Sequence, residues 1–284
     1  MVWHRQASHS TCVKRAGKKV NPGETPAGAI EASLKLAAEG RGSLVTNLVE
    51  NLTSLDDAIA VRDHYLGFLD QLQAQNVPGQ VSVKPTQLGL DLSQRACAEH
   101  LDVLAAKAAA TGSFLWIDME DSSYVDRTLD LYRVLKAKHD RTGIAIQAYL
   151  RRTPADIDSL MSLKPVIRLV KGAYAEPPDV AFAAKSETDL AYFDLSERML
   201  ERALVGECTP IFGTHDISLL QRLVSRAKDL GVADGRYEIH MLYGIRDGDQ
   251  RRLRSDGRVV RTLISYGESW YQGDMRRLAG RAAN

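Results

Sequence analysis

The sequence contains few cysteines and no cysteine motif. Of its 284 residues only 3 are cysteines, Cys12, Cys97 and Cys208, and no two of them form a CxxC pair. Scattered cysteines of this kind fit a reducing cytoplasm and argue against a disulfide framework or a zinc site. We therefore expect a cytoplasmic protein without a metal centre.

An excess of charge and a long apolar run are also missing. The chain has 37 basic and 36 acidic residues, a net charge of +1, and this balance does not favour a nucleic-acid partner. No apolar run approaches the ~18 residues of a membrane span. Residues 1–20 are basic but lack the apolar core of a secretory signal. We expect no stable insertion into a membrane, and a transient peripheral contact stays open.

What the chain does contain is an alternation of short apolar segments with longer amphipathic ones. The apolar content is 44%, enough for the core of a single large domain. The amphipathic segments show the i, i+3, i+4 spacing of surface helices and include 55–75, 93–110, 123–139, 188–205 and 217–230. The expected strands are 43–48, 81–84, 114–119, 144–149, 166–171, 210–215, 237–242 and 259–264.

Eight strands that alternate with helices predict an α/β fold with a parallel sheet. Eight repeats in about 240 residues match a (β/α)8 barrel of the TIM type, for which ~250 residues are typical. A doubly wound sheet is the alternative, but it usually has a glycine-rich loop after its first strand, and SLVTNLVENL has none. We expect residues 1–40 to form an N-terminal arm and a helix that stops at Gly40, and residues 41–284 to form the barrel.

Nearly every expected strand ends in a charged or polar residue. In a (β/α)8 barrel the chemistry sits at the C-terminal ends of the strands, so these residues predict a pocket. One or two of them could be ion pairs of a structural core, but a ring of them is better explained by a ligand. The residues at these ends are Glu50, Lys84, Asp118, Gln147, Arg168, Lys171, Thr214, His215, Leu242 and Tyr243.

The segment VIRLVKGAYAEP, residues 166–177, combines two cations with small residues. Arg168 and Lys171 lie on opposite faces of the strand, and near its end both can reach a ligand from different sides. Gly172 and Ala173 leave room for a flat ligand against the backbone, and Tyr174 adds a ring and a hydroxyl. The pattern favours a large, flat, anionic ligand. An internal network of the two cations with aspartates is the alternative.

RLVKGAY, residues 168–174, also resembles the signature of the proline dehydrogenase family. Similar motifs follow in the same order from about residue 42 to the end of the chain. They are VSVKPTQLGLDLS (81–93), IDMEDSSYVDRTLDLYR (117–133), FGTHD (212–216), MLYGIR (241–246) and YGESWYQGDMRRLAGRAAN (266–284). The resemblance implies a flavoenzyme with a distorted (β/α)8 barrel and FAD as its cofactor.

The resemblance implies hydride transfer from the carbon next to the ring nitrogen of proline, or of a proline-like cyclic amino acid, to the flavin, which gives a cyclic imine. The electron acceptor would be a quinone or a soluble carrier. The residues implied in FAD binding are Met119, Gln147, Arg168, Lys171, Gly172, Ala173, Thr214 and His215. Those implied in substrate binding are Glu50, Lys84, Tyr174, Leu242, Leu263, Arg276 and Arg277.

Within this set, Lys84, Arg276 and Arg277 would hold the substrate carboxylate, for which guanidinium groups are well suited. Glu50 would pair with the first of the two arginines. Asp118 and Arg168 are implied in catalysis. An aspartate that follows the apolar segment FLWI is costly to bury without a partner, and we expect Lys84 to be the partner of Asp118.

Four positions depart from the family's pattern. Leu263 and Gly273 stand where the family has tyrosines, Gly280 where it has a glutamate, and His240 where it has a glutamine. Replacing two tyrosines removes large rigid contacts with the substrate ring and opens space. Three interpretations follow: the enzyme oxidises a bulkier or hydroxylated cyclic amino acid, it oxidises proline poorly, or it has lost catalysis and kept a flavin-binding or structural role.

Overall fold

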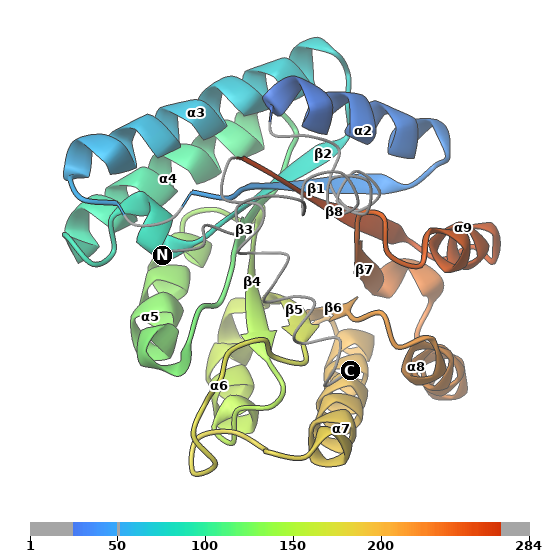
Figure 1. The fold of residues 1–284 in the computed structure, drawn as a ribbon. Coiled ribbons are helices and arrows are strands. Elements are labelled where there is room, and N and C mark those ends of the chain that lie inside the picture. Colours follow the sequence, from blue (N-terminus) through green and yellow to red (C-terminus); the bar gives the residue numbers. More distant parts are fainter. Residues whose placement is uncertain (1–24, 50–51, 268–284) are drawn as a thin grey trace, which may run out of the picture.

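The computed structural model describes residues 25–49 and 52–267, and within them eight parallel strands close into a barrel (Figure 1). The strands pair in sequence order, and β8 returns to pair with β1. They are β1 (Gly42–Asn47), β2 (Gly79–Val83), β3 (Leu115–Ile117), β4 (Thr142–Gln147), β5 (Val166–Val170), β6 (Thr209–Gly213), β7 (Glu238–Leu242) and β8 (Val260–Tyr266). The predicted (β/α)8 barrel is confirmed, and each expected strand overlaps an observed one.

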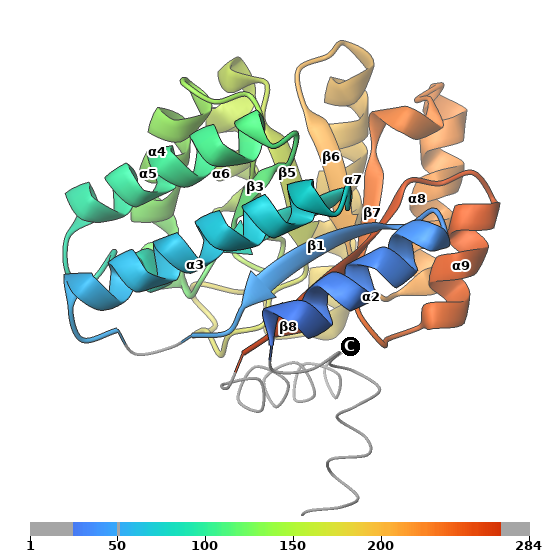
Figure 2. The ribbon, with the colours of Figure 1, turned by 90° about the horizontal axis from the view of Figure 1, so that it is seen from above.

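Helices surround the strands (Figures 1 and 2). They are α2 (Pro26–Ala38), α3 (Leu55–Ala74), α4 (Gln94–Ala110), α5 (Val125–Lys136), α6 (Thr153–Leu160), α7 (Lys185–Leu204), α8 (Ile217–Leu230) and α9 (Asp247–Ser255). Short 3-10 helices span Pro85–Leu88, Ser122–Tyr124, Met161–Leu163 and Asp234–Arg236. Within this described part of the chain, no helix combines the length and apolar character needed to cross a membrane.

Short polar side chains start several of these helices. Ser54 accepts a hydrogen bond from the backbone N–H of Asp57, whose carboxylate bonds back to Ser54 N, and this capping box begins α3. Asp216 accepts from Leu219 N and begins α8. The expected helix that stops at Gly40 is α2, which packs on β1 and β8. The domain boundary at residue 40 stays a prediction.

The interior of the barrel has an apolar plug. Leu44, Trp116 and Ile211 are buried there, and Leu263 packs against them. Below the plug, towards the N-terminal ends of the strands, Trp116 Nε1 donates to Gln80 Oε1 at 2.7 Å. Residues of the opposite strand faces pack outwards against the helices as a second, larger core. The plug therefore leaves the C-terminal end of the barrel as the place for a polar cavity.

Tyr65 joins α3 to the strands that border this cavity. It is fully buried, and its hydroxyl accepts from Asn47 N at 2.8 Å and donates to Ser82 O at 3.1 Å. Tyr65→Phe should lower the free energy of unfolding by about 1–3 kcal/mol, because it leaves the Asn47 N–H buried without a partner. Urea denaturation measures the change. Tyr124→Phe is the matched control, because it removes only the exposed bond to Asp91 and should cost about 0.5 kcal/mol or less. Equal losses in the two variants would contradict this account.

Candidate active site

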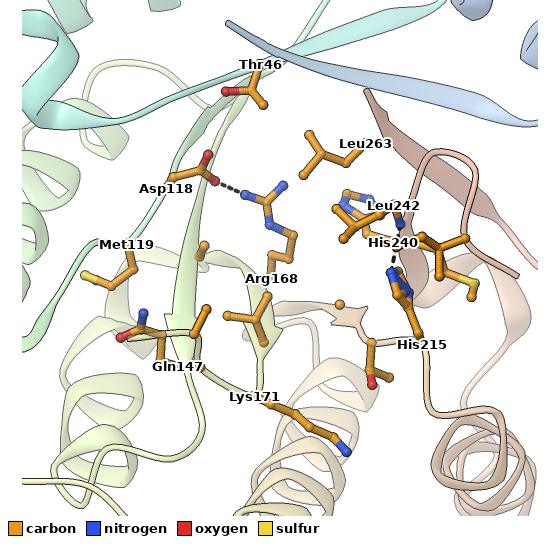
Figure 3. Close-up of a pocket in the computed structure, with 18 of the residues that line it drawn as sticks. Thr46, Asp118, Met119, Gln147, Arg168, Lys171, His215, His240, Leu242 and Leu263 are labelled. Carbon is orange, nitrogen blue, oxygen red and sulfur yellow. Dashed lines mark hydrogen bonds and ion pairs between the residues drawn. The ribbon is translucent and has the colours of Figure 1, made fainter. Parts of the chain in front are cut away.

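A cavity of about 680 Å³ opens at the C-terminal ends of the strands (Figure 3). Its volume is in the range of small-molecule and cofactor sites. The expected site residues that line it are Lys84, Asp118, Met119, Gln147, Arg168, Lys171, Gly172, Ala173, Tyr174, Thr214, His215, Leu242 and Leu263. Glu50, Arg276 and Arg277 lie outside the described residues, as do Gly273 and Gly280. The structure thus gathers thirteen of the expected residues around one space, and their individual roles stay predictions.

Arg168 of β5 and Asp118, which follows β3, form an ion pair across the barrel (Figure 3). Ser82 Oγ donates to Asp118 Oδ1 at 2.8 Å and accepts from Arg168 Nη2 at 3.2 Å. The guanidinium carbon also lies 5.0 Å from the centroid of the Trp116 ring, within the range of a cation–π contact. Burial lowers the pKa of Arg168, and the charge of Asp118 opposes that shift. The guanidinium is therefore a buried, paired and firmly oriented positive charge.

This pairing differs from the partner expected for Asp118. The sequence suggests Lys84, which follows the neighbouring strand, whereas the structure pairs Asp118 with Arg168, two strands further along the sheet. An arginine in the middle of a strand faces into the barrel, and its long side chain reaches to β3 through the interior. The order of the strands in the sequence therefore does not predict that Arg168 is the partner of Asp118. Lys84 itself lies at the rim, where the chain enters the 3-10 helix Pro85–Leu88.

Lys171 points away from Arg168 (Figure 3), as their opposite strand faces predict. Its Nζ lies 2.5 Å from Asp189 of α7 and 3.1 Å from Asp216. Lys185 Nζ also lies 2.5 Å from Asp189. Arg168 and Lys171 therefore both line the cavity and are both paired with aspartates. The internal ion-pair network is therefore present, and the contact of this segment with a ligand stays a prediction.

Gly172 is required for a reason that the sequence does not show. Its φ is +128°, and a Cβ at this position would lie 2.3 Å from Cδ1 of Tyr149. Gly172 lines the cavity, and the Tyr149 ring fills the space where a side chain at this position would lie. A Cβ on Gly213 of β6 would meet Val170 at 2.8 Å. Close backbone approach at both positions shapes this side of the cavity.

The buried polar atoms on the cavity wall that have no hydrogen-bond partner among the described residues include Gln147 Oε1, an acceptor, and Arg168 Nη1, a donor. Such groups are costly to bury unless a partner satisfies them. An acceptor and a charged donor on adjacent strands suit a planar heterocycle that carries N–H and carbonyl groups, such as the pyrimidine part of a flavin. The residues present therefore fit the cofactor that the resemblance implies.

Tyr174 lies on the connection between β5 and α7, which is hydrogen-bonded to the side chain of Tyr149 and to Ser122. Tyr149 Oη donates to Tyr174 O at 3.3 Å, and Glu176 accepts from Ser122 N at 2.7 Å and from Ser122 Oγ at 2.6 Å. Burial raises the pKa of the Tyr174 hydroxyl. This hydroxyl therefore stays protonated at neutral pH and can donate a hydrogen bond at the rim.

Some cavity residues were missed by the sequence reasoning. Besides the expected residues, the wall includes Thr46, Ala145, Gly213, Asp216, His240, Gly244, Ile245 and Arg246. Strand alternation could have found Thr46 and His240, since each lies two positions from an inward-facing neighbour, Leu44 and Leu242 respectively. Strand alternation does not mark Ile245 or Arg246 as cavity residues, because they lie in an irregular connection, although they belong to the motif MLYGIR (241–246).

His240 is a buried imidazole on the cavity floor. It is 3% exposed, its Nε2 lies 3.1 Å from Glu238 Oε2, and its ring packs edge-on against Trp116. Burial lowers the pKa of His240 to about 4, although the carboxylate of Glu238 opposes the shift. Burial would raise the pKa of Glu238, but its bonds with His240 and Arg261 hold it at about 2. The floor therefore carries a neutral imidazole that donates to a carboxylate.

The stability of the protein should depend on pH through His240. In an unfolded chain the imidazole titrates near 6.5, whereas the folded protein keeps it neutral down to about pH 4. Between these values the unfolded state binds the extra proton, so stability falls as pH falls. From pH 7 to pH 5 the parent should lose about 2 kcal/mol more than His240→Gln. Urea denaturation at both pH values measures this, and equal losses would show that the imidazole is not buried in its neutral form.

Comparison with known proteins gives one consistent result. The family model of the proline dehydrogenases matches residues 29–281. Proline dehydrogenase 2 of Bacillus subtilis subsp. natto is 36% identical over 250 residues, which cover 88% of this chain and 81% of the relative. The proline dehydrogenase of Deinococcus radiodurans is 31% identical over 264 residues, 90% of this chain and 83% of the relative.

Among solved structures, proline utilization A (PutA) from Bdellovibrio bacteriovorus, inactivated by N-propargylglycine, superposes with a TM-score of 0.83 at 24% identity. The match covers 90% of this chain and 31% of that one, so this chain spans about a third of the larger protein. At this identity the match supports the barrel fold alone. The family model and the curated relatives go further: the chain belongs to the proline dehydrogenase family.

Proposed function

We propose that this protein is an FAD-dependent oxidoreductase that removes a hydride from the carbon beside the ring nitrogen of proline or a proline-like cyclic amino acid, leaving a cyclic imine. The observation that carries the proposal is the cavity wall with the buried Arg168–Asp118 pair and the unpartnered atoms Arg168 Nη1 and Gln147 Oε1. Family membership adds the reaction type.

The cofactor would be held by the wall that β3 to β6 form. Gln147 and Arg168 would satisfy polar atoms of the ring, and Gly172 and Ala173 would let it approach the backbone. The remaining proposed contacts are Met119, Lys171, Thr214 and His215. FAD supplies the hydride acceptor when it is bound. The fixed charge of Arg168 would stabilise negative charge that develops beside it.

The substrate would lie between Lys84, Tyr174, Leu242 and Leu263. Its carboxylate would be held by Lys84 with Arg276 and Arg277, and Glu50 would pair with Arg276, as the resemblance implies. Asp118 borders the same space, and its fixed orientation would help to position the substrate. The ring nitrogen must be neutral for hydride to leave, so the substrate reacts as the free amine, and the iminium ion that results would lose its N–H proton to solvent to give the cyclic imine. A quinone or a soluble carrier would reoxidise the protein, and we place the reaction in the cytoplasm.

The first test is cofactor binding. The parent protein should take up FAD without a covalent bond and turn yellow, which a visible absorption spectrum shows. Gly172→Ala should weaken FAD binding by tenfold or more, because the new Cβ forces the strand end away from Tyr149. Gly231→Ala is the matched control: φ is +78° there but no atom lies within 4 Å, so it carries backbone strain without a clash. A parent protein that is colourless after incubation with excess FAD and removal of the unbound FAD would refute the flavin proposal.

The finer proposal is that the preferred substrate is larger than proline or carries a ring hydroxyl. Leu263 pairs with Leu242 across β7 and β8 at the cavity wall. A leucine there leaves space that the family's tyrosine would fill, and an unfilled pocket costs about 1–3 kcal/mol per discriminating group. Substrates that fill it should exceed proline in kcat/KM by about tenfold. The panel is proline, its 3- and 4-hydroxy forms and pipecolate, read by anaerobic bleaching of the flavin.

Leu263→Tyr should shift the preference back towards proline. If proline bleaches the flavin fastest and Leu263→Tyr leaves the ranking unchanged, the pocket does not select a larger substrate. If FAD binds but no member of the panel bleaches it, the second candidate function is correct. That candidate is a flavin-binding homologue with impaired catalysis, and the loss of two tyrosines and a glutamate at Leu263, Gly273 and Gly280 favours it.

A further inference from the structure

The connection between β7 and α9 forms one wall of the cavity without regular structure of its own. Leu242, Gly244, Ile245 and Arg246 all line the cavity. Gly244 has φ +70° and Arg246 has φ +53°, and the second value is unfavourable for a residue with a side chain. A segment in these conformations keeps its shape only when bonds from elsewhere fix it.

Gln250 of α9 supplies two such bonds. Its Nε2 donates to Leu242 O at 3.0 Å and to Ile245 O at 2.7 Å, so the amide is bonded to the connection at two points three residues apart. The side chain is fully buried and is not part of the cavity wall. Two carbonyl groups on one side of the amide require its NH2 group there, which fixes the orientation of the amide.

The other side of the amide is fastened to two further strands. Gln250 Oε1 accepts from Thr262 Oγ1 of β8 at 2.6 Å and from Arg41 Nη1 at 3.0 Å. Arg41 is 3% exposed, lies just before β1 and is held in turn by Asp247 at 2.8 Å. The side chain of Gln250 therefore makes four hydrogen bonds and joins the cavity connection to β8 and to Arg41 beside β1.

Leu242 is held from a second direction as well. Its backbone N–H donates to His215 Nε2 at 3.3 Å, the bond drawn as a dashed line in Figure 3. The carbonyl of the same residue is the one that Gln250 binds. His215 is a proposed cofactor contact, and the Leu242 side chain is a proposed substrate contact. A shift of Leu242 would therefore change both parts of the site.

We propose that Gln250 is a positioning residue, which fixes the wall from Leu242 to Arg246 for substrate and cofactor without contacting either. This proposal rests on the proposed function for what binds in the cavity. A purely structural residue would change stability alone, whereas a positioning residue changes binding in the fraction of protein that remains folded.

Gln250→Glu tests the proposal, because it keeps the shape of the side chain and both acceptor bonds but removes the two donations to the connection. Thr262→Val is the matched control, since it removes one partner of Oε1 and leaves both donations. Both variants should lower Tm. Only Gln250→Glu should raise KM and the Kd for FAD, each by about tenfold, and should speed hydrogen exchange at residues 243–246.

The pH dependence of Gln250→Glu gives a further readout. A protonated glutamic acid can donate one of the two lost bonds, so the ratio of its KM to that of the parent should fall as pH falls. Parent-like KM, Kd and exchange in Gln250→Glu would overturn the proposal, as would equal changes in Thr262→Val. If the parent oxidises no cyclic amino acid, the proposed function fails by itself, and the exchange rates at 243–246 still decide whether Gln250 holds the wall.

Discussion

The charge of Arg168 inside the barrel is the constraint around which the site is arranged. A guanidinium that is 5% exposed needs a counter-charge and hydrogen-bond partners, or its burial would cost several kcal/mol. Asp118 supplies the charge and Ser82 orients both groups. The apolar plug lies in the barrel interior, and the ring of its Trp116 lies 5.0 Å from the guanidinium carbon. Arg168 thus connects the polar cavity, where it pairs with Asp118, to the apolar plug, where it contacts the Trp116 ring.

The second cation of the same segment behaves differently. Lys171 and Lys185 alternate with Asp189 and Asp216, so the charge of Lys171 is already balanced by the protein. An anionic ligand near Lys171 would compete with two carboxylates for one ammonium group. Its binding would gain less from Lys171 than from an unpaired lysine. Affinity for a dinucleotide would therefore depend more on backbone contacts, as at Gly172, than on this side chain.

Much of the fold was predictable because its signal is local. Parallel strands covered on both faces read as apolar runs, and α8 shows a clear apolar stripe, so strands and long helices were found near their observed positions. The helix α9, DGDQRRLRS, was not predicted, because only Gln250 and Leu253 of it are buried and no apolar periodicity results. The partners of Gln250 come from residues 41, 242, 245 and 262, which no local pattern connects. The partner of Asp118 and the role of Tyr149 beside Gly172 were likewise beyond a local reading.

Of the positions that depart from the family's pattern, the two that the structure describes, His240 and Leu263, lie on one side of the cavity. His240 and Leu263 belong to β7 and β8, whereas Arg168 belongs to β5, Gln147 to β4, and Asp118 follows β3. Leu263 packs on the plug as well as lining the cavity, and His240 contacts Trp116 of the same plug. A change on this side can therefore reshape the space for a substrate while Arg168 and Asp118 keep their positions. If the proposed function is correct, one wall preserves the redox chemistry and the other is free to select the substrate.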